Sequence, residues 1–219
     1  MITTSKLRRS SGQKSHSPPW ERKGDISFTE FCATIHDGQK ADLLHGVIHL
    51  ASPDNTDNSD LQSWLQALLY EFIKIYSLGK LYTSRVAFRL NKKNGPEPDI
   101  AFVSTKNLSR VKRGYVEGPP DLAVEIVSPE SAYRDYKQKR ELYESSGVLE
   151  YWIIDPEEKN ATFLVRKGSR FVEAKPVKLQ WNSQVLSGLS FDVRWLWTDH
   201  RPSIFEVLKK HYYPETSDS

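Results

Sequence analysis

The sequence predicts a single α/β domain in which a mixed β-sheet is flanked by α-helices. Short apolar or alternating stretches, typical of strands, are interspersed with longer stretches of helical periodicity. Several of the strand-like stretches are joined by short turns, which favours a mixed sheet. At 219 residues, with 38% hydrophobic and 27% charged residues, the chain has the size and composition of one globular domain.

The first residues are basic and are expected to lie outside this domain. We predict a disordered basic tail over residues 1–25, the domain over 26–213 and a C-terminal tail over 214–219. The basic tail could attract a polyanion such as nucleic acid, but a net charge of only +3 does not decide the function.

Targeting signals and cysteine usage indicate the compartment. The basic tail lacks the apolar segment of a secretory signal, and no stretch approaches the roughly 18 apolar residues that cross a bilayer. Cys32 is the only cysteine, which fits a reducing compartment. We therefore expect a cytoplasmic protein with no membrane partner.

The domain is expected to open with a short helix and a strand pair. Ser27 and Glu30 have the spacing of a capping box, and apolar residues suited to a short helix follow. The stretch 42–50 predicts two strands that turn at His45–Gly46.

A loop, a long helix and a strand are expected next. Residues 51–59 are rich in Ser, Asn, Asp and Pro and predict a loop. Apolar residues recur at helical spacing over 60–77, and Gly79 is the expected stop. The stretch 82–90 alternates and predicts one half-buried strand.

The second half is expected to alternate strands with two helices. A helix over 131–146 is expected to end at Gly147, and Pro202 begins a last helix that ends near His211. A long basic connection spans 104–120. The expected strands are 99–103, 122–127, 151–154, 162–166 and short ones between 171 and 191.

Glu125 is the most conspicuous residue in the chain. It lies within the apolar strand 122–127, which reads as central in its sheet, and a carboxylate there requires an ion partner or a metal. Asp99 begins another strand. If the two strands are neighbours, Asp99 and Glu125 can share Mg²⁺, with Mn²⁺ as a substitute. Asp121 has the same side-chain parity as Glu125 and could join them, although a turn role after Pro119–Pro120 explains it about equally well.

The helix that follows offers a cation on one face. Asp135, Lys139 and Tyr143 are spaced four apart, and Lys137 lies about 160° from Lys139 around an ideal helix, so only one of the two lysines can face the site. Two alternatives stay open at this point. Glu125 could be the partner of a buried Arg or Lys, and Asp135 with Lys139 could be a surface ion pair.

With these residues in place, the sequence resembles the Uma-type restriction endonuclease family of the PD-(D/E)xK nuclease superfamily. The similarity runs from about Phe28 to Trp197 and combines PDL-x-x-E-x-x-S with D-x-x-x-K-x-x-x-Y and GV-x-EYW. The matching stretches are GPEPDIAFVS (95–104), PPDLAVEIVSPES (119–131), RDYKQKRELYESSGVLEYWIIDPE (134–157) and GLSFDVRWLW (188–197).

The resemblance implies a restriction-endonuclease-like fold and a site. Asp99 would be the aspartate of the PD element and Glu125 the acid of the second element. Val127 occupies the usual lysine position, and Lys139 on the next helix would replace that lysine. Asp42 stands where relatives commonly carry a Glu, so it would be a further metal ligand. Relatives also commonly carry a His near the start of the long helix, and this chain has none between Ala51 and Leu65.

The implied reaction is Mg²⁺-dependent hydrolysis of phosphodiester bonds in DNA, with Asp99, Glu125 and Lys139 as catalytic residues. A homodimer would suit two-fold cleavage of duplex DNA. Candidate phosphate contacts are Arg85, Arg89, Lys112 and Arg113. Two alternatives are a nuclease fold that binds nucleic acid or a protein partner without cutting, and a structural domain in which Glu125 is only a buried ion-pair member.

Overall fold

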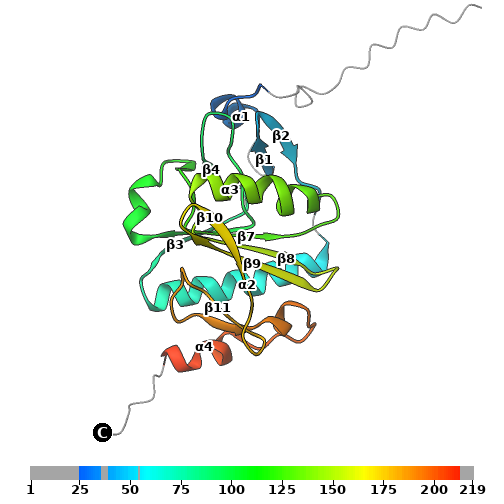
Figure 1. Ribbon diagram of the computed structural model, residues 1–219, viewed down its shortest axis with the longest axis vertical. Coiled ribbons are helices and arrows are strands. Elements are labelled where there is room, and N and C mark those ends of the chain that lie inside the picture. The colour runs from blue at the N-terminus through cyan, green and yellow to red at the C-terminus, as the bar shows by residue number, and fades with distance from the viewer. Residues whose placement is uncertain (1–24, 36–38, 54, 213–219) are drawn as a thin grey trace, which may run out of the picture.

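The computed structural model describes residues 25–35, 39–53 and 55–212, and a six-stranded sheet lies at its centre (Figure 1). β7 and β8 pair in parallel, and the other neighbours pair antiparallel, so the expected mixed sheet is confirmed. The predicted tails lie outside the described residues, apart from Asp25. The strand order is β10 (Arg170–Ala174), β9 (Asn160–Lys167), β8 (Glu150–Asp155), β7 (Leu122–Ile126), β5 (Ile100–Ser104) and β3 (Gly79–Thr83).

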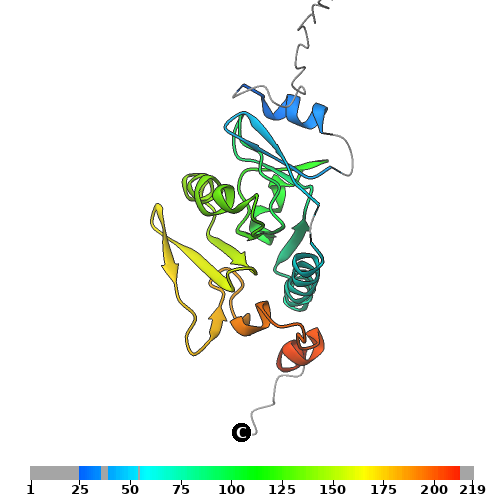
Figure 2. The same cartoon turned by 90° about the vertical axis from the view of Figure 1, so that its right-hand side faces the viewer.

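Helices cover both faces of the sheet, which explains why β7 is apolar on both sides (Figure 2). Val124 packs on the face covered by the long helix α2 (Thr56–Ile75). Ala123 packs on the opposite face, with Tyr143 of α3 (Arg140–Ser146). The segment containing α3 also makes the crossover that joins the parallel strands β7 and β8.

The long helix begins and ends earlier than its apolar periodicity indicated. The Asn55 side chain caps α2 by accepting a hydrogen bond from the backbone N–H of Asn58 at 2.8 Å. Residues 56–59, predicted as loop, therefore form its first turn. Gly79 is not the stop but opens β3, where a Cβ would lie 2.1 Å from the carbonyl oxygen of Val103.

The single strand predicted over 82–90 is two strands in different sheets. The chain turns at Arg85, whose φ of 77° lies in the left-handed region. β4 (Ala87–Arg89) then pairs in parallel with β6 (Tyr115–Glu117). The alternating pattern concealed this turn, because residues 84–86 contain no Gly or Pro.

A smaller layer stands above the sheet in Figure 1. The capping box of Ser27 is formed, and the hairpin turns at His45–Gly46, as predicted. Positive φ angles of 52° and 76° at these two residues suit a two-residue turn, which sets Asp42 opposite His49. The layer consists of α1 (Phe28–Thr34), β1 (Ala41–Leu44), β2 (Val47–Leu50), β4 and β6.

The helix predicted over 131–146 is formed, but its first part is π-helical. The segment η3 (Arg134–Lys139) runs into α3, which ends at Gly147 in the left-handed conformation. The Tyr151 hydroxyl donates to the carbonyl oxygen of Asp135 at 2.9 Å, so a side chain holds this carbonyl where the helix widens. π-Helical turns are rare in proteins, and those that occur are often found at functional sites.

The C-terminal segment packs on the α2 side of the sheet. Trp181 stacks on Phe163 with ring centroids 4.0 Å apart, and the last helix lies against α2. The remaining elements are η2 (Thr105–Arg110), β11 (Gln180–Asn182), β12 (Ser190–Asp192), η4 (Val193–Leu196) and α4 (Ile204–Tyr212).

Glu150 anchors this segment to the sheet as a buried hydrogen-bond acceptor. Its Oε2 accepts from the Ser183 hydroxyl at 3.1 Å and from the backbone N–H groups of Gln184 and Val185, each at 2.8 Å. Its Oε1 accepts from the Trp152 indole N–H at 2.6 Å. Burial raises the pKa of Glu150, and these donors oppose the shift.

We expect Glu150→Gln to lower the free energy of unfolding by about 2 kcal/mol. In either orientation, the N–H₂ group of the amide would face a group that now donates a hydrogen bond to Glu150. Urea denaturation measures the loss, and Glu173→Gln on the exposed part of β10 is the control. Equal stability of the two variants would contradict an acceptor-only role for Glu150.

Candidate functional site

Asp99 and Glu125 face one small cavity at the ends of β5 and β7. The two strands are antiparallel with Ile100 opposite Val124, and continuing this register by one residue places Asp99 opposite Glu125. Both acids are buried, with 7% and 1% of their surface exposed, and both line a cavity of about 40 Å³. Asp99 also accepts a hydrogen bond from the backbone N–H of Ile126 at 2.7 Å.

Lys139 joins three carboxylates in this cavity. Its Nζ lies 2.9 Å from Asp42 Oδ2, 2.9 Å from Glu125 Oε2 and 3.3 Å from Asp135 Oδ1. The side chain is 3% exposed. Lys137 points away and is exposed, so Lys139 is the lysine of this segment that reaches the acids.

A second lysine, which the sequence did not single out, pairs with Asp99. Lys40 forms an ion pair with this acid and lines the same cavity. The backbone N–H of Glu97 donates to Asp42 Oδ1 at 2.8 Å, and Glu97 Oε2 accepts from the Ala41 N–H at 3.1 Å. Two spacings could have indicated these residues, since Lys40 and Asp42, like Glu97 and Asp99, are two positions apart in extended chain.

Tyr143 and His49 complete the surroundings of the acids. The Tyr143 hydroxyl donates to Glu125 Oε1 at 2.8 Å, so Tyr143 and Lys139 hold the two oxygens of this carboxylate. His49 lines the cavity from β2, opposite Asp42. The expected turn at His45–Gly46 already implies that His49 pairs with Asp42.

The electrostatics of the cavity favour an additional cation. Burial raises the pKa of Glu125 to about 8, although Lys139 opposes the shift. Burial also favours a higher pKa for Asp42, but the charges of Lys139 and Lys40 outweigh burial and hold this pKa below its ordinary value. The pKa of Lys139 lies well above its ordinary value, because the attraction of Asp42, Glu125 and Asp135 outweighs desolvation.

The residues that line the cavity fit a divalent ion. By formal charge the five carboxylates outnumber the three strongly basic groups, and the raised pKa of Glu125 reflects the cost of a further buried negative charge, which a divalent ion would offset. Each carboxylate oxygen has about two lone pairs, which leaves acceptor capacity beside the hydrogen bonds already made. Within the described ranges, no three acidic, His or Cys side chains form a ready metal cage. Mg²⁺ needs none, since one or two carboxylates with water and phosphate suffice. The charged lining groups are Asp42, Asp99, Glu125, Glu130, Asp135, Lys40, Arg134 and Lys139.

The structure brings Asp42 to Asp99 and Glu125 but leaves Asp121 apart. Asp121 shares the side-chain parity of Glu125, yet it stands at the other end of β7, about 13 Å away at 3.3 Å per residue. Its carboxylate accepts from the Ser104 backbone N–H at 2.7 Å and from Asn107 Nδ2 at 2.8 Å. Asp121 therefore lies outside the acidic cavity, and its hydrogen bonds to nearby residues fit the alternative prediction of a turn residue.

We expect Asp121→Asn to keep the affinity for Mn²⁺ within about twofold of wild type and to lower the free energy of unfolding by about 1–2 kcal/mol. The amide would turn an N–H₂ group toward a donor on Ser104 or Asn107. Calorimetric titration and urea denaturation measure the two effects. A folded variant with metal affinity reduced tenfold would return Asp121 to the site.

The basic residues predicted to contact phosphate lie outside the acidic cavity. Arg85, Arg89 and Arg113 line a separate, larger pocket beside α1. Arg89 also lies 3.5 Å from Glu117, its partner on β6. Lys112 does not line this pocket, and its ammonium group donates to the carbonyl oxygen of Ser109 at 2.9 Å.

Comparisons with known proteins indicate the family and the fold of the chain. The family model Uma2, described as "Putative restriction endonuclease", matches residues 27–194. A solved structure from Anabaena variabilis, described as "a putative nuclease belonging to DUF820", superposes with a TM-score of 0.64 at 18% identity, covering 78% of this chain and 97% of that chain. At this identity the likeness concerns the fold, and the restriction-endonuclease-like α/β architecture is confirmed.

The search of curated proteins finds no match. The described helices include none that is both long enough and apolar enough to span a bilayer. The family match covers most of the chain and includes both acidic strands and the helix of Lys139. The chain therefore belongs to the Uma2 family of putative restriction endonucleases.

Proposed function

We propose that the protein is a Mg²⁺-dependent endonuclease that hydrolyses phosphodiester bonds of DNA, with Mn²⁺ able to replace Mg²⁺. The observation that carries the proposal is the convergence of Asp99 and Glu125 on one buried cavity beside Lys139. The carboxylates that line this cavity outnumber its basic groups, which suits a divalent cation. The family match supports nuclease chemistry.

Asp99 and Glu125 would hold the ion, and Asp42 is placed to complete its surroundings. A bound divalent ion would stabilise charge on a phosphoryl oxygen and lower the pKa of a bound water. Tyr143 and the Ile126 N–H orient the two acids by hydrogen bonds of 2.8 and 2.7 Å.

Lys139 would act as a donor rather than a base. The pKa of Lys139 lies well above its ordinary value, so Nζ keeps its proton and can hydrogen-bond to the attacking water or to the phosphoryl group. His49 differs, because burial lowers the pKa of its imidazole. The neutral ring of His49 lines the cavity and can accept a proton from water.

A second candidate function is binding of nucleic acid or a protein partner without cleavage. One observation favours it: Lys139 and Lys40 already pair with the acids, and the cavity measures only about 40 Å³. An active enzyme must open this arrangement when the ion and phosphate enter.

Incubation with supercoiled plasmid and labelled oligonucleotides tests the proposal. We expect nicking or cutting in millimolar Mg²⁺ or Mn²⁺ and none in chelator. Metal binding without any cleavage across several divalent ions would favour the second candidate. Size-exclusion chromatography with light scattering, run on the same preparation, tests whether a protein that cuts both strands is a homodimer.

A further inference from the structure

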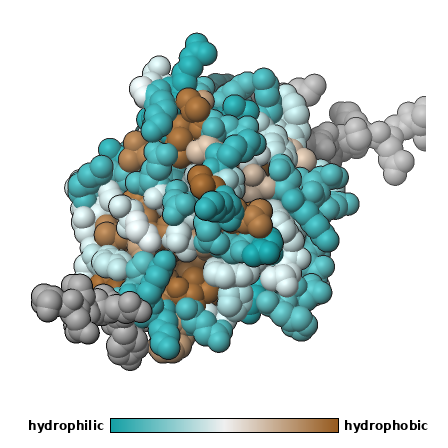
Figure 3. Space-filling model, turned by 60° about the horizontal axis from the view of Figure 1, so that its bottom comes forward, coloured by the Kyte–Doolittle hydropathy of each residue, from teal (hydrophilic) through white to brown (hydrophobic). Residues whose placement is uncertain are grey.

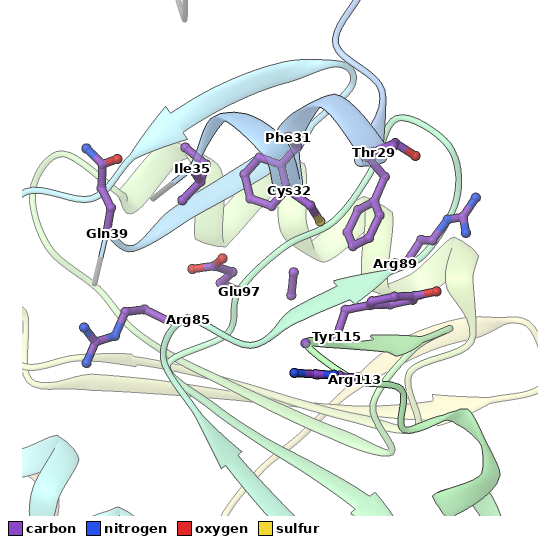
Figure 4. Close-up of a pocket in the computed structure, with 13 residues that line it drawn as sticks. Thr29, Phe31, Cys32, Ile35, Gln39, Arg85, Arg89, Glu97, Arg113 and Tyr115 are labelled. Atoms are coloured by element: carbon purple, nitrogen blue, oxygen red, sulfur yellow. The ribbon is translucent and has the colours of Figure 1, made fainter. Parts of the chain in front are cut away.

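A second pocket lies beside the acidic cavity, between α1 and the β4–β6 pair (Figure 4). Its volume is about 600 Å³, a size typical of pockets for small organic ligands. Figure 4 shows Phe31 and Cys32 of α1 above the pocket, with Tyr115 and Arg113 below it. Arg85, also labelled in Figure 4, lines the pocket as well.

The pocket adjoins the acidic cavity through two segments of chain. Glu97 lines the pocket, whereas Asp99, two residues further, lines the cavity. Likewise Gln39 lines the pocket and Lys40 the cavity. Two residues of extended chain span at most about 7 Å. A nucleic-acid strand bound at the cavity can therefore place a neighbouring nucleotide in the pocket.

The lining of the pocket suits a ligand that is both anionic and aromatic. Three arginines line it against one carboxylate, that of Glu97. The ion pair of Arg89 with Glu117 is 3.5 Å long, and the two side chains are 37% and 46% exposed, so the pair competes weakly with a ligand. Arginine is the preferred partner of phosphate, and aromatic walls are the usual partners of unstacked bases.

We propose that this pocket binds one unpaired nucleotide of the substrate strand, with the arginines on its phosphate and the half-buried Tyr115 against its base. The identity of the strand as DNA rests on the proposed function. In an intact duplex the bases are stacked and paired inside the helix. The protein should therefore prefer single strands, overhangs or extruded bases to continuous duplex.

Cys32 provides a direct test, because it is the only cysteine of the chain and lines the pocket. In chelator, where cleavage does not interfere, a short oligothymidylate is expected to slow the reaction of Cys32 with a thiol reagent by about fivefold or more. A duplex of the same length should protect less. Binding measured by fluorescence anisotropy should weaken about fivefold in Arg113→Ala.

The matched control is Lys209→Ala, which removes an exposed positive charge on α4, at the opposite end of the molecule from α1 (Figure 1). This variant should bind within about twofold of wild type. The inference is overturned if the oligonucleotide binds without protecting Cys32, if the duplex protects equally, or if both variants weaken binding alike. Protection of Cys32 without metal-dependent cleavage by wild type would sink the proposed function and leave the pocket standing. Metal-dependent cleavage without protection of Cys32 would overturn the pocket proposal and leave the proposed function standing.

Discussion

Replacement of Lys139 by methionine is expected to lower the free energy of unfolding of the metal-free protein by about 3–5 kcal/mol. Lys139 is the shared ion-pair partner of Asp42, Glu125 and Asp135 in a site nearly closed to solvent. Its removal leaves three buried carboxylates without their common cation. Methionine fills similar space, so the loss reports the missing charge rather than a cavity. Urea denaturation in chelator measures it.

Lys137→Met is the matched control on the same helical segment. Lys137 pairs with Glu141 at 2.8 Å, but both side chains are 61% exposed, so the change should stay within about 0.5 kcal/mol. Millimolar Mn²⁺ should restore part of the stability lost in Lys139→Met, because a divalent ion supplies positive charge to the folded state. Equal stability of the two methionine variants would show that Lys139 does not hold the acids together.

Glu125→Gln is expected to reduce metal-dependent cleavage by at least about 10³-fold. The amide removes the negative charge and one ligand oxygen, and a metal ion contributes several kcal/mol to stabilising the transition state. The variant should remain folded, because the amide oxygen can still accept from Lys139 and the Tyr143 hydroxyl can accept from the amide. Initial rates on plasmid in Mg²⁺ measure the effect.

Glu141→Gln, an exposed change on α3, is the control for this experiment and should cut within about twofold of wild type. The two variants are compared at equal folded fraction, checked by circular dichroism. If Glu125→Gln cuts at the rate of Glu141→Gln, the cleavage in the preparation does not come from this cavity.

The chemically informative part of the site was predictable because its signal is local. A carboxylate within an apolar strand must have a partner, so Glu125 was conspicuous from its neighbours alone. The four-residue spacing of Asp135, Lys139 and Tyr143 indicated one helical face, although no sequence pattern indicated that the segment is π-helical.

The residues that escaped prediction depend on contacts between distant segments. Lys40 and Glu97 reach the acids only because β1 packs beside the chain that precedes β5. Side-chain parity grouped Asp121 with Glu125, but parity carries no information about distance along a strand. The turn at Arg85 also escaped, because its left-handed backbone occurs at a residue other than Gly.

The larger interaction surfaces could not be read from the sequence either. Arg85, Arg89 and Arg113 were predicted as separate phosphate contacts, and only the fold gathers them around one pocket (Figure 4). On the face in Figure 3, apolar residues occupy small areas separated by hydrophilic ones.

X-ray diffraction from crystals soaked in Mn²⁺ tests most directly whether Asp99 and Glu125 share one metal ion. The data are collected for the anomalous signal of manganese. The account predicts one peak bonded to an oxygen of Asp99 and an oxygen of Glu125, at about 2.0–2.3 Å from each, and no peak there in Glu125→Gln. A peak elsewhere with this position empty, or the same peak in the variant, would contradict it.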